Sequence, residues 1–306
     1  MTVGQARLFG KESLLAFSPS PSLDADVFLC ALLAWDKTRL IFHRDENLSK
    51  EVEEHFKAWI NARKTGLPVA YITGHKEFYG YDFLVTPAVL IPKSDTEVLV
   101  EKGLDFIKEK RRANEKKILT ICDMCTGSGC VGLSILAECI EKKIIPYEFI
   151  PALTLADISL AALEIARANA EKLLGPFFQK KVSLVHTNLF QSIGQSFDII
   201  VSNPPYVPWN ETEELLKDGR SEPALALNGD IDLFGNPTGD CDGLGVMRNL
   251  VKEAKDHLFR NGLLLVEAGE YNAEMTEYLF RSAGFSDTHI YKDLSGQLRV
   301  ISGVKA

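Results

Sequence analysis

Phe197-Asp198-Ile199-Ile200-Val201-Ser202-Asn203-Pro204-Pro205-Tyr206 is a strand-like apolar run that ends in two consecutive prolines. Both prolines lack an N–H group and fix φ, so neither a strand nor a helix interior can continue through them. They also push Asn203 out of the α region. We therefore predict a stiff loop at the carboxyl end of a strand, which is where open α/β sheets bind their ligands.

The loop Asn203-Pro204-Pro205-Tyr206 presents groups that suit a planar N–H₂ group. Asn203 Oδ1 and a proline carbonyl can accept the two hydrogens of such a group, and the ring of Tyr206 can pack against its plane. The alternative interpretation is an ordinary β-turn that happens to contain prolines. The ends of the other expected strands bear on this choice.

The composition is that of a globular protein, because 46% of the 306 residues are hydrophobic and 25% are charged. The length predicts one large domain with a smaller one, or two of comparable size. A net charge of −8 argues against a protein that wraps a long nucleic acid, which needs clustered Lys and Arg. The N-terminus has no basic stretch before an apolar core, and no run reaches the ~18 apolar residues of a membrane helix, so we expect a cytoplasmic protein without a membrane span.

The six cysteines do not form a metal-binding pattern. Cys122 and Cys125 make a C-x-x-C pair. A zinc site would need a second pair or histidines at ligand spacing, and none follows. We expect reduced, packed thiols and no metal.

The first third of the chain is expected to be helical. Ser22 can cap a helix whose apolar residues between Leu23 and Trp35 lie on one face, and a second helix is expected after Ser49. These patterns predict a small helical module over residues 1–73. The aromatic and turn residues from Phe78 to Ile91 then predict a β-hairpin.

From Lys117 onward, strand patterns alternate with helix patterns. The expected strands are Ile118–Met124, Leu153–Ala156, Val182–Val185, Phe197–Ser202, Leu263–Glu267, Thr288–Tyr291 and Leu298–Ser302. The expected helices are Val131–Lys142, Leu160–Leu174, Val246–Phe259 and Ala273–Ser282. This alternation predicts an α/β fold with a mostly parallel, seven-stranded sheet and helices on both faces. The long polar segment 207–242 is typical of a lid or binding loop.

The stretch Asp123-Met124-Cys125-Thr126-Gly127-Ser128-Gly129-Cys130 joins the first expected strand of this sheet to its first helix. Gly127 and Gly129 allow a tight turn and the close approach of a ligand to the backbone. The following residues do not complete the Gly-x-Gly-x-x-Gly dinucleotide pattern, so a nicotinamide cofactor is disfavoured.

The next two expected strands also end in polar residues. Asp157 ends the second strand, where an acid commonly holds ribose hydroxyls; the alternative is a helix cap, a role that Ser159 can also fill. Asn188 and Leu189 follow the third strand and could contact the edge and the face of an adenine ring.

A glycine loop, an acid, an amide and Asn-Pro-Pro-Tyr at the ends of four successive strands resemble the class I S-adenosylmethionine-dependent methyltransferases. Within that group, Asn-Pro-Pro-Tyr is typical of enzymes that methylate planar amino nitrogens in adenine, guanine or glutamine. The stretches from Pro68 to Gly80, from Leu90 to Glu97 and from Ser221 to Leu227 resemble the HemK/PrmC family, whose members methylate the glutamine of the Gly-Gly-Gln motif in class-1 peptide chain release factors.

This resemblance implies a helical substrate-recognition domain at 1–73, a β-hairpin linker at 74–92 and a Rossmann-like methyltransferase domain at 93–306. It implies an enzyme that uses S-adenosylmethionine, acts as a monomer on release factors, and binds no nucleic acid directly. The implied catalytic and substrate-binding residues are Asn203, Pro204, Pro205 and Tyr206. The implied cofactor-binding residues are Cys125, Thr126, Gly127, Ser128, Gly129, Asp157, Asn188, Leu189 and Asn203.

The chain departs from the family pattern at several positions. Cys125 stands where a glycine is usual, Lys93-Ser94 replaces Arg-Pro, and about eight residues are inserted around Ile231–Asp240. Cys125 and Ser94 resemble a sister branch that methylates a large-subunit ribosomal protein, so this substrate is one alternative. DNA or ribosomal RNA is the other.

Overall fold

The computed structural model describes residues 1–113, 117–217, 222–232, 234, 236–238 and 241–306. It divides into two compact units. Unit 1 comprises Met1–His75 and Glu214–Ser221, and unit 2 comprises Lys76–Glu213 and Glu222–Ala306. Each unit has its own hydrophobic core.

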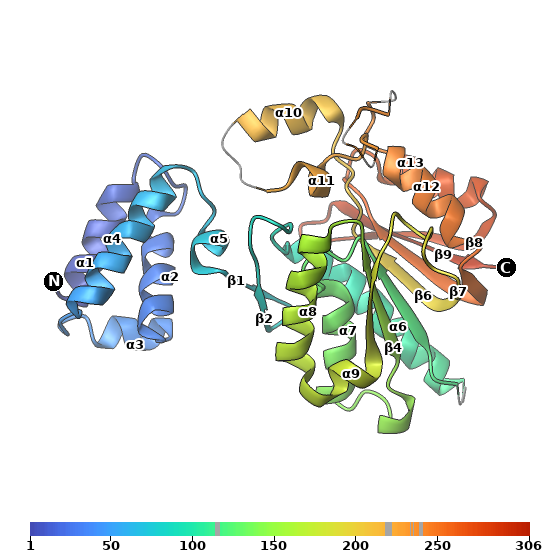
Figure 1. The fold of residues 1–306 in the computed structure, drawn as a ribbon, viewed down its shortest axis with the longest axis horizontal. Coiled ribbons are helices and arrows are strands. Elements are labelled where there is room, and N and C mark those ends of the chain that lie inside the picture. Colours follow the sequence, from blue (N-terminus) through green and yellow to red (C-terminus); the bar gives the residue numbers. More distant parts are fainter. Residues whose placement is uncertain (114–116, 218–221, 233, 235, 239–240) are drawn as a thin grey trace. The chain divides into compact units, whose positions relative to one another are not determined.

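Unit 1 is built from short helices around a small apolar core. Its helices are α1 (Val3–Leu14), α2 (Pro21–Leu33), α3 (Lys37–Phe42), α4 (Lys50–Lys64) and α5 (Val69–Thr73), as Figure 1 shows. α4 begins after Ser49 as predicted, and the Ser49 hydroxyl caps it by accepting the N–H of Val52 at 3.2 Å. The predicted cap at Ser22 is wrong, because α2 begins at Pro21 and Ser22 lies inside the helix. The fixed φ of proline favours the first helical position.

Unit 2 contains the predicted seven-stranded, mostly parallel sheet. Its strands are β3 (Thr120–Met124), β4 (Ala152–Asp157), β5 (Val182–His186), β6 (Phe197–Ser202), β7 (Leu258–Glu267), β8 (Phe285–Lys292) and β9 (Leu298–Lys305). They lie in the order β5-β4-β3-β6-β7-β9-β8, and only β9 runs antiparallel to its neighbours. β3 pairs with both β4 and β6, so the strand order reverses there, and ligands bind at such a reversal.

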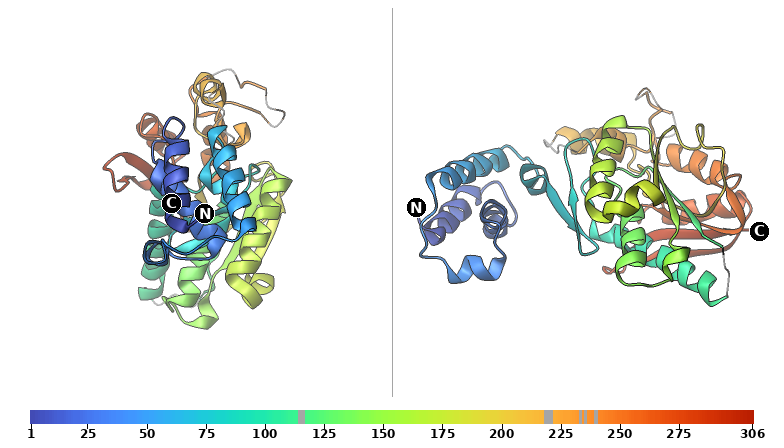
Figure 2. Two further views of the ribbon diagram at one scale, coloured as in Figure 1. Left: turned by 90° about the vertical axis from the view of Figure 1, so that its left-hand side faces the viewer. Right: turned by 60° about the horizontal axis from the view of Figure 1, so that its bottom comes forward.

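Helices cover both faces of this sheet (Figures 1 and 2). One face carries α6 (Glu97–Arg112), α7 (Cys130–Glu141) and α8 (Leu160–Leu174), and the other carries α12 (Gly245–Ala254) and α13 (Ala273–Ser282).

The shorter elements are β1 (His75–Phe78), β2 (Tyr81–Leu84), η1 (Ser94–Thr96), η2 (Tyr147–Phe149), η3 (Gly175–Phe177), α9 (Phe178–Lys181), α10 (Trp209–Lys217) and α11 (Ala224–Leu227).

The central strands are unbroken apolar runs because helices cover both faces of the sheet. In β6, Ile199 and Val201 pack into the core under α6, α7 and α8, while Ile200 packs under α12 and α13. Successive side chains of a strand point to opposite faces, so a strand that is buried on both faces needs apolar residues at every position.

One predicted helix was too long. We expected it to run from Val246 to Phe259, but α12 ends at Ala254 and β7 begins at Leu258. Leu258 pairs with Phe197 across the sheet, which requires extended backbone where the apolar pattern alone would have continued the helix. Such a pairing between distant segments overrides local periodicity.

Asn169 joins the hairpin β1–β2 and the glycine loop to α8. Its Oδ1 accepts the N–H of Leu84 at 2.7 Å, and its Nδ2 donates to the carbonyls of Leu84 at 3.0 Å and Ser128 at 2.9 Å. The side chain is fully buried. One buried side chain therefore satisfies three backbone groups.

Asn169→Ala should lower the unfolding midpoint of the protein by about 6 °C or more. Each buried backbone group that loses its partner costs about 1–3 kcal/mol, and in a domain of this size 1 kcal/mol corresponds to about 2–4 °C. The matched control is Arg167→Ala on the same helix, whose side chain is exposed and whose midpoint should hardly move. Calorimetry that gives equal midpoints for the two variants would contradict the bracing role.

Candidate functional site

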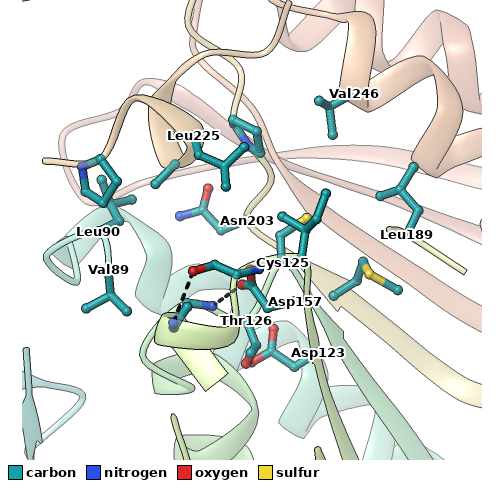
Figure 3. A pocket seen from close by; sticks show the side chains of 18 of the residues that line it. Val89, Leu90, Asp123, Cys125, Thr126, Asp157, Leu189, Asn203, Leu225 and Val246 are labelled. Atoms are coloured by element: carbon teal, nitrogen blue, oxygen red, sulfur yellow. Dashed lines mark hydrogen bonds between the residues drawn. The ribbon is translucent and has the colours of Figure 1, made fainter. Parts of the chain in front are cut away.

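A cavity of about 490 Å³ lies in unit 2 where the carboxyl ends of β3, β4, β5 and β6 meet. The loops that follow these strands contribute Cys125 to Ser128, Asp157, Asn188, Leu189, Asn203 and Pro205 to its lining. Figure 3 shows several of these side chains around the cavity. Its volume is that of a typical small-molecule site. The four strand ends singled out in the sequence therefore lie together.

The glycine loop after β3 makes a tight left-handed turn. Cys125, Gly127 and Gly129 have φ of 59°, 55° and 82°. A Cβ atom at Gly127 would meet nothing within 4 Å, whereas one at Gly129 would lie 2.8 Å from the side chain of Leu133. Gly127 therefore leaves room for a ligand, and the left-handed backbone at Gly129 favours glycine there.

Cys125 is the unusual member of this loop. A left-handed backbone costs a residue with a side chain about 1–2 kcal/mol relative to glycine, so the replacement of the family's usual glycine stores strain here. Burial, and then the negative charge of Asp157, raise the pKa of the Cys125 thiol. The thiol therefore stays protonated, and all six cysteines are free.

Asp123 braces the glycine loop from inside the protein, a role that the sequence analysis missed. Its Oδ2 accepts the Thr126 hydroxyl at 2.8 Å and the Gly132 N–H at 2.9 Å. Burial raises the pKa of this carboxyl to about 7. The available signal was an acid inside an apolar strand, because a buried acid needs hydrogen-bond partners.

Asp157 connects the loops that follow β3 and β4. Its Oδ2 accepts the Gly127 N–H at 2.9 Å and its Oδ1 accepts the Ser159 N–H at 2.9 Å. Ser159 rather than Asp157 caps α8, through a 3.2 Å bond from the Ala162 N–H. Burial raises the pKa of Asp157. Each carboxylate oxygen can accept a further hydrogen bond from a ligand in the cavity.

The loop after β5 is held against the end of β4. The Thr187 N–H donates to the Asp157 carbonyl at 3.0 Å, and the Thr187 hydroxyl donates to the Leu189 carbonyl at 2.9 Å. Leu189 has a φ of 43°, which turns the chain so that both Asn188 and Leu189 line the cavity.

The Asn-Pro-Pro-Tyr loop presents some of its members to the cavity and turns the others away. Asn203 and Pro205 line the cavity, whereas Pro204 is buried. The hydroxyl of Tyr206 donates to Glu267 Oε1 at 3.2 Å, and its ring is not part of the lining. Tyr206 therefore anchors the loop to the end of β7 in this structure.

The orientation of the Asn203 side chain is set by Thr96, which precedes α6. Asn203 Nδ2 donates to Thr96 Oγ1 at 3.2 Å, so Oδ1 remains as an acceptor for a ligand. Thr96 is buried, and it lines the cavity. Thr96 lies within the Leu90–Glu97 stretch, and no role was predicted for it, since nothing in one sequence indicates which residue will contact Asn203.

An ion pair closes one side of the cavity. Lys93 Nζ donates to Glu222 Oε1 at 2.8 Å, and the Ile91 N–H reaches the same oxygen at 3.3 Å. Pro223 and Leu225, which follow Glu222, are part of the lining. Lys93, which replaces the family's usual arginine, thus ties this segment to the chain before η1.

The described ranges hold no group of three or more His, Cys, Asp or Glu side chains placed to bind a metal ion. None of their helices combines the length and the hydropathy needed to cross a membrane.

Comparisons with known proteins agree with this geometry. The family model of the PrmC N-terminal domain matches residues 5–74, and that of the methyltransferase small domain matches residues 100–237. The release factor glutamine methyltransferase of Borreliella burgdorferi is 35% identical over 280 residues, which make up 92% of this chain and 88% of that protein. The protein of the same name from Burkholderia pseudomallei is 34% identical, with 95% of this chain and 94% of that protein covered.

The chain also matches a bifunctional methyltransferase of Rickettsia conorii, at 33% identity over 302 residues. It spans about half of that relative, 53% of its length. The predicted resemblance to the HemK/PrmC family is confirmed by these matches. The chain belongs to the family of release factor glutamine methyltransferases.

Proposed function

We propose that the protein methylates the side-chain amide nitrogen of the glutamine in the Gly-Gly-Gln motif of class-1 peptide chain release factors. The observation that carries the proposal is the arrangement of Asn203. Its Nδ2 is bound to Thr96, which leaves Oδ1 as an acceptor in the cavity that the glycine loop and Asp157 also line. A substrate N–H₂ group needs such an acceptor.

The residues around the cavity fit S-adenosylmethionine. The loop from Cys125 to Gly129 would approach the amino-acid part of the cofactor, with open space at Gly127. Asp157 would accept the ribose hydroxyls, and Asn188 and Leu189 would contact the adenine edge and face. When bound, the cofactor supplies a methyl group that is already activated by the sulfonium charge.

The contribution of this chain is to position the amide nitrogen. A glutamine amide is a poor nucleophile because its lone pair is delocalised. Asn203 Oδ1 and a proline carbonyl of the loop would accept its two N–H groups and turn the lone pair toward the methyl group. Alignment of this kind can lower a barrier by up to about 7–11 kcal/mol. The two prolines lack an N–H group and fix φ, so their carbonyls keep a fixed direction, which supports this alignment.

The proposal also covers how the protein recognises its substrate and where it acts. Residues 1–73 would recognise the body of the release factor, and the net charge of −8 suits a partner with a basic surface. We propose a cytoplasmic monomer that acts in translation termination and does not bind nucleic acid directly.

A folded release factor incubated with the protein and S-adenosylmethionine should gain one methyl group on the glutamine of its Gly-Gly-Gln loop. A short peptide with the same motif should react slowly, because remote contacts help to hold the loop in line. Tandem mass spectrometry of the digested product locates the methyl group. A release factor with Gly-Gly-Ala is the control. Methylation found only on a large-subunit ribosomal protein, or only on DNA or RNA, would replace the proposal with one of the two alternatives.

Asp157→Ala should weaken the binding of S-adenosylmethionine about 10- to 150-fold, because a charge-assisted hydrogen bond is worth about 1.5–3 kcal/mol. Calorimetry gives the affinity, and Asp256→Ala is the control that removes the same charge from an exposed position. A cofactor analogue without ribose hydroxyls separates direct contact from loop bracing. The variant and the unaltered protein should bind it about equally, and a large difference would point to bracing of Gly127 instead.

Asn203→Ala should lower kcat by about 100-fold, as removal of a preorganised hydrogen bond to a reacting group does in other enzymes. Cofactor affinity should change much less, because the lost contact is made to the reacting nitrogen. Asn210→Ala, at an exposed position, controls for the substitution itself. A variant that methylates at the normal rate would refute the role given to Asn203.

A further inference from the structure

Asn203 is the first member of a series of polar side chains that runs from the cavity into the core of unit 2. Asn203 Nδ2 donates to Thr96 Oγ1 at 3.2 Å. The Thr96 hydroxyl lowers the pKa of the buried Glu267 carboxyl, which is the effect of a donor on its charged form. Glu267 is the last residue of β7, and its side chain is 1% exposed. A residue that faces the substrate is thus connected to a buried acid.

The two oxygens of Glu267 have different surroundings. Oε1 accepts the Tyr206 hydroxyl at 3.2 Å. Oε2 is buried, and within the described part of the chain it has no hydrogen bond of standard geometry. A buried oxygen without a donor is costly. This favours a Thr96 hydroxyl that points its hydrogen toward Glu267.

The direction of these contacts follows from what each group can do. An ionised carboxylate only accepts hydrogen bonds, whereas a hydroxyl donates one and accepts others. Once its hydrogen is directed to Glu267, Thr96 can only accept from Asn203. Asn203 must then offer Nδ2–H to Thr96, and its Oδ1 is left for the substrate.

We propose that Glu267 is a positioning residue that determines, through Thr96, which atom of the Asn203 amide meets the substrate. The inference rests on the proposed function, because only a substrate N–H₂ group makes this orientation matter. When Glu267 is protonated, its O–H group can donate to Thr96, whose own hydrogen then turns to Asn203 Oδ1. The Asn203 amide rotates, and its N–H₂ group opposes that of the substrate.

The surroundings of Glu267 place this change near neutral pH. Burial raises the pKa of its carboxyl to about 7, against the opposing effects of Thr96, Arg299 and Tyr206. The ionisable groups that face it come from four elements: Tyr206 after β6, Arg299 on β9, Asp95 in η1 and Cys130 at the start of α7. The active orientation requires the ionised form, so kcat should fall as the pH drops below about 7.

The pH dependence of kcat, measured with saturating cofactor and release factor, tests the proposal. Glu267→Gln should lower kcat about tenfold at pH 8 and remove the inflection near pH 7, because the neutral side chain no longer forces Thr96 to donate to it. Glu270→Gln makes the same change at an exposed position three residues later and should keep the inflection. Asp123 also has a pKa of about 7, but it braces the cofactor loop, and saturating cofactor masks its effect on kcat.

Variants of Thr96 give a second test of the proposal. Thr96→Val removes the hydroxyl and should lower kcat about tenfold or more, with the KM for the release factor changed less. Thr96→Ser restores the hydroxyl and should recover most of the loss. Thermal unfolding of each variant shows whether the core remains folded.

NMR signals of the Asn203 side-chain amide give a measurement that does not depend on activity. Its side-chain ¹⁵N–¹H₂ signals, assigned from their loss in Asn203→Ala, should shift with a midpoint near pH 7 in the unaltered protein. In Glu267→Gln they should not titrate. Equal pH profiles and equal Asn203 titrations in the unaltered protein and Glu267→Gln would overturn the inference. A protein that shows the Asn203 titration but methylates no glutamine would instead overturn the proposed function.

Discussion

Buried side chains that must find hydrogen-bond partners hold the loops of this site in place. Asp123, Asp157 and Asn169 are buried, and each makes a hydrogen bond to the glycine loop, at Thr126, Gly127 and Ser128 respectively. Because an unpaired buried polar group is costly, a loop that moved away would break several contacts at once. The cavity is therefore preorganised before any ligand arrives, which reduces the ordering that binding requires.

The sequence predicted the elements whose limits are local. The helix Leu160–Leu174 and the strand Phe197–Ser202 have the predicted bounds, since Ser159 caps the first and Asn203-Pro204 ends the second. Strand ends with polar residues also predicted the position of the cavity. Thr96 and Glu267 were missed because their roles depend on contacts between segments more than 100 residues apart, here 107 positions between Thr96 and Asn203. Local patterns carry no information about such pairs.

Two departures from the family pattern have visible physical effects. Cys125 adopts a left-handed backbone that glycine would adopt without strain, so this loop is stiffer and less stable than its glycine counterpart. Lys93 keeps the ion pair to Glu222 that closes one wall of the cavity, but its ammonium is a point charge and lacks the fork of an arginine.

The reversal of strand order between β3 and β6 also has a consequence for how the chain folds. The Ser202 hydroxyl that donates to the Met124 carbonyl joins residues 78 positions apart, and β4, α8 and β5 all lie between them in the chain. Contacts of such long range form late, because the intervening chain must first lose its conformational freedom. During synthesis the cofactor pocket can therefore close only after β6 has been made. From then on, each bound cofactor molecule draws the equilibrium toward the native state by mass action.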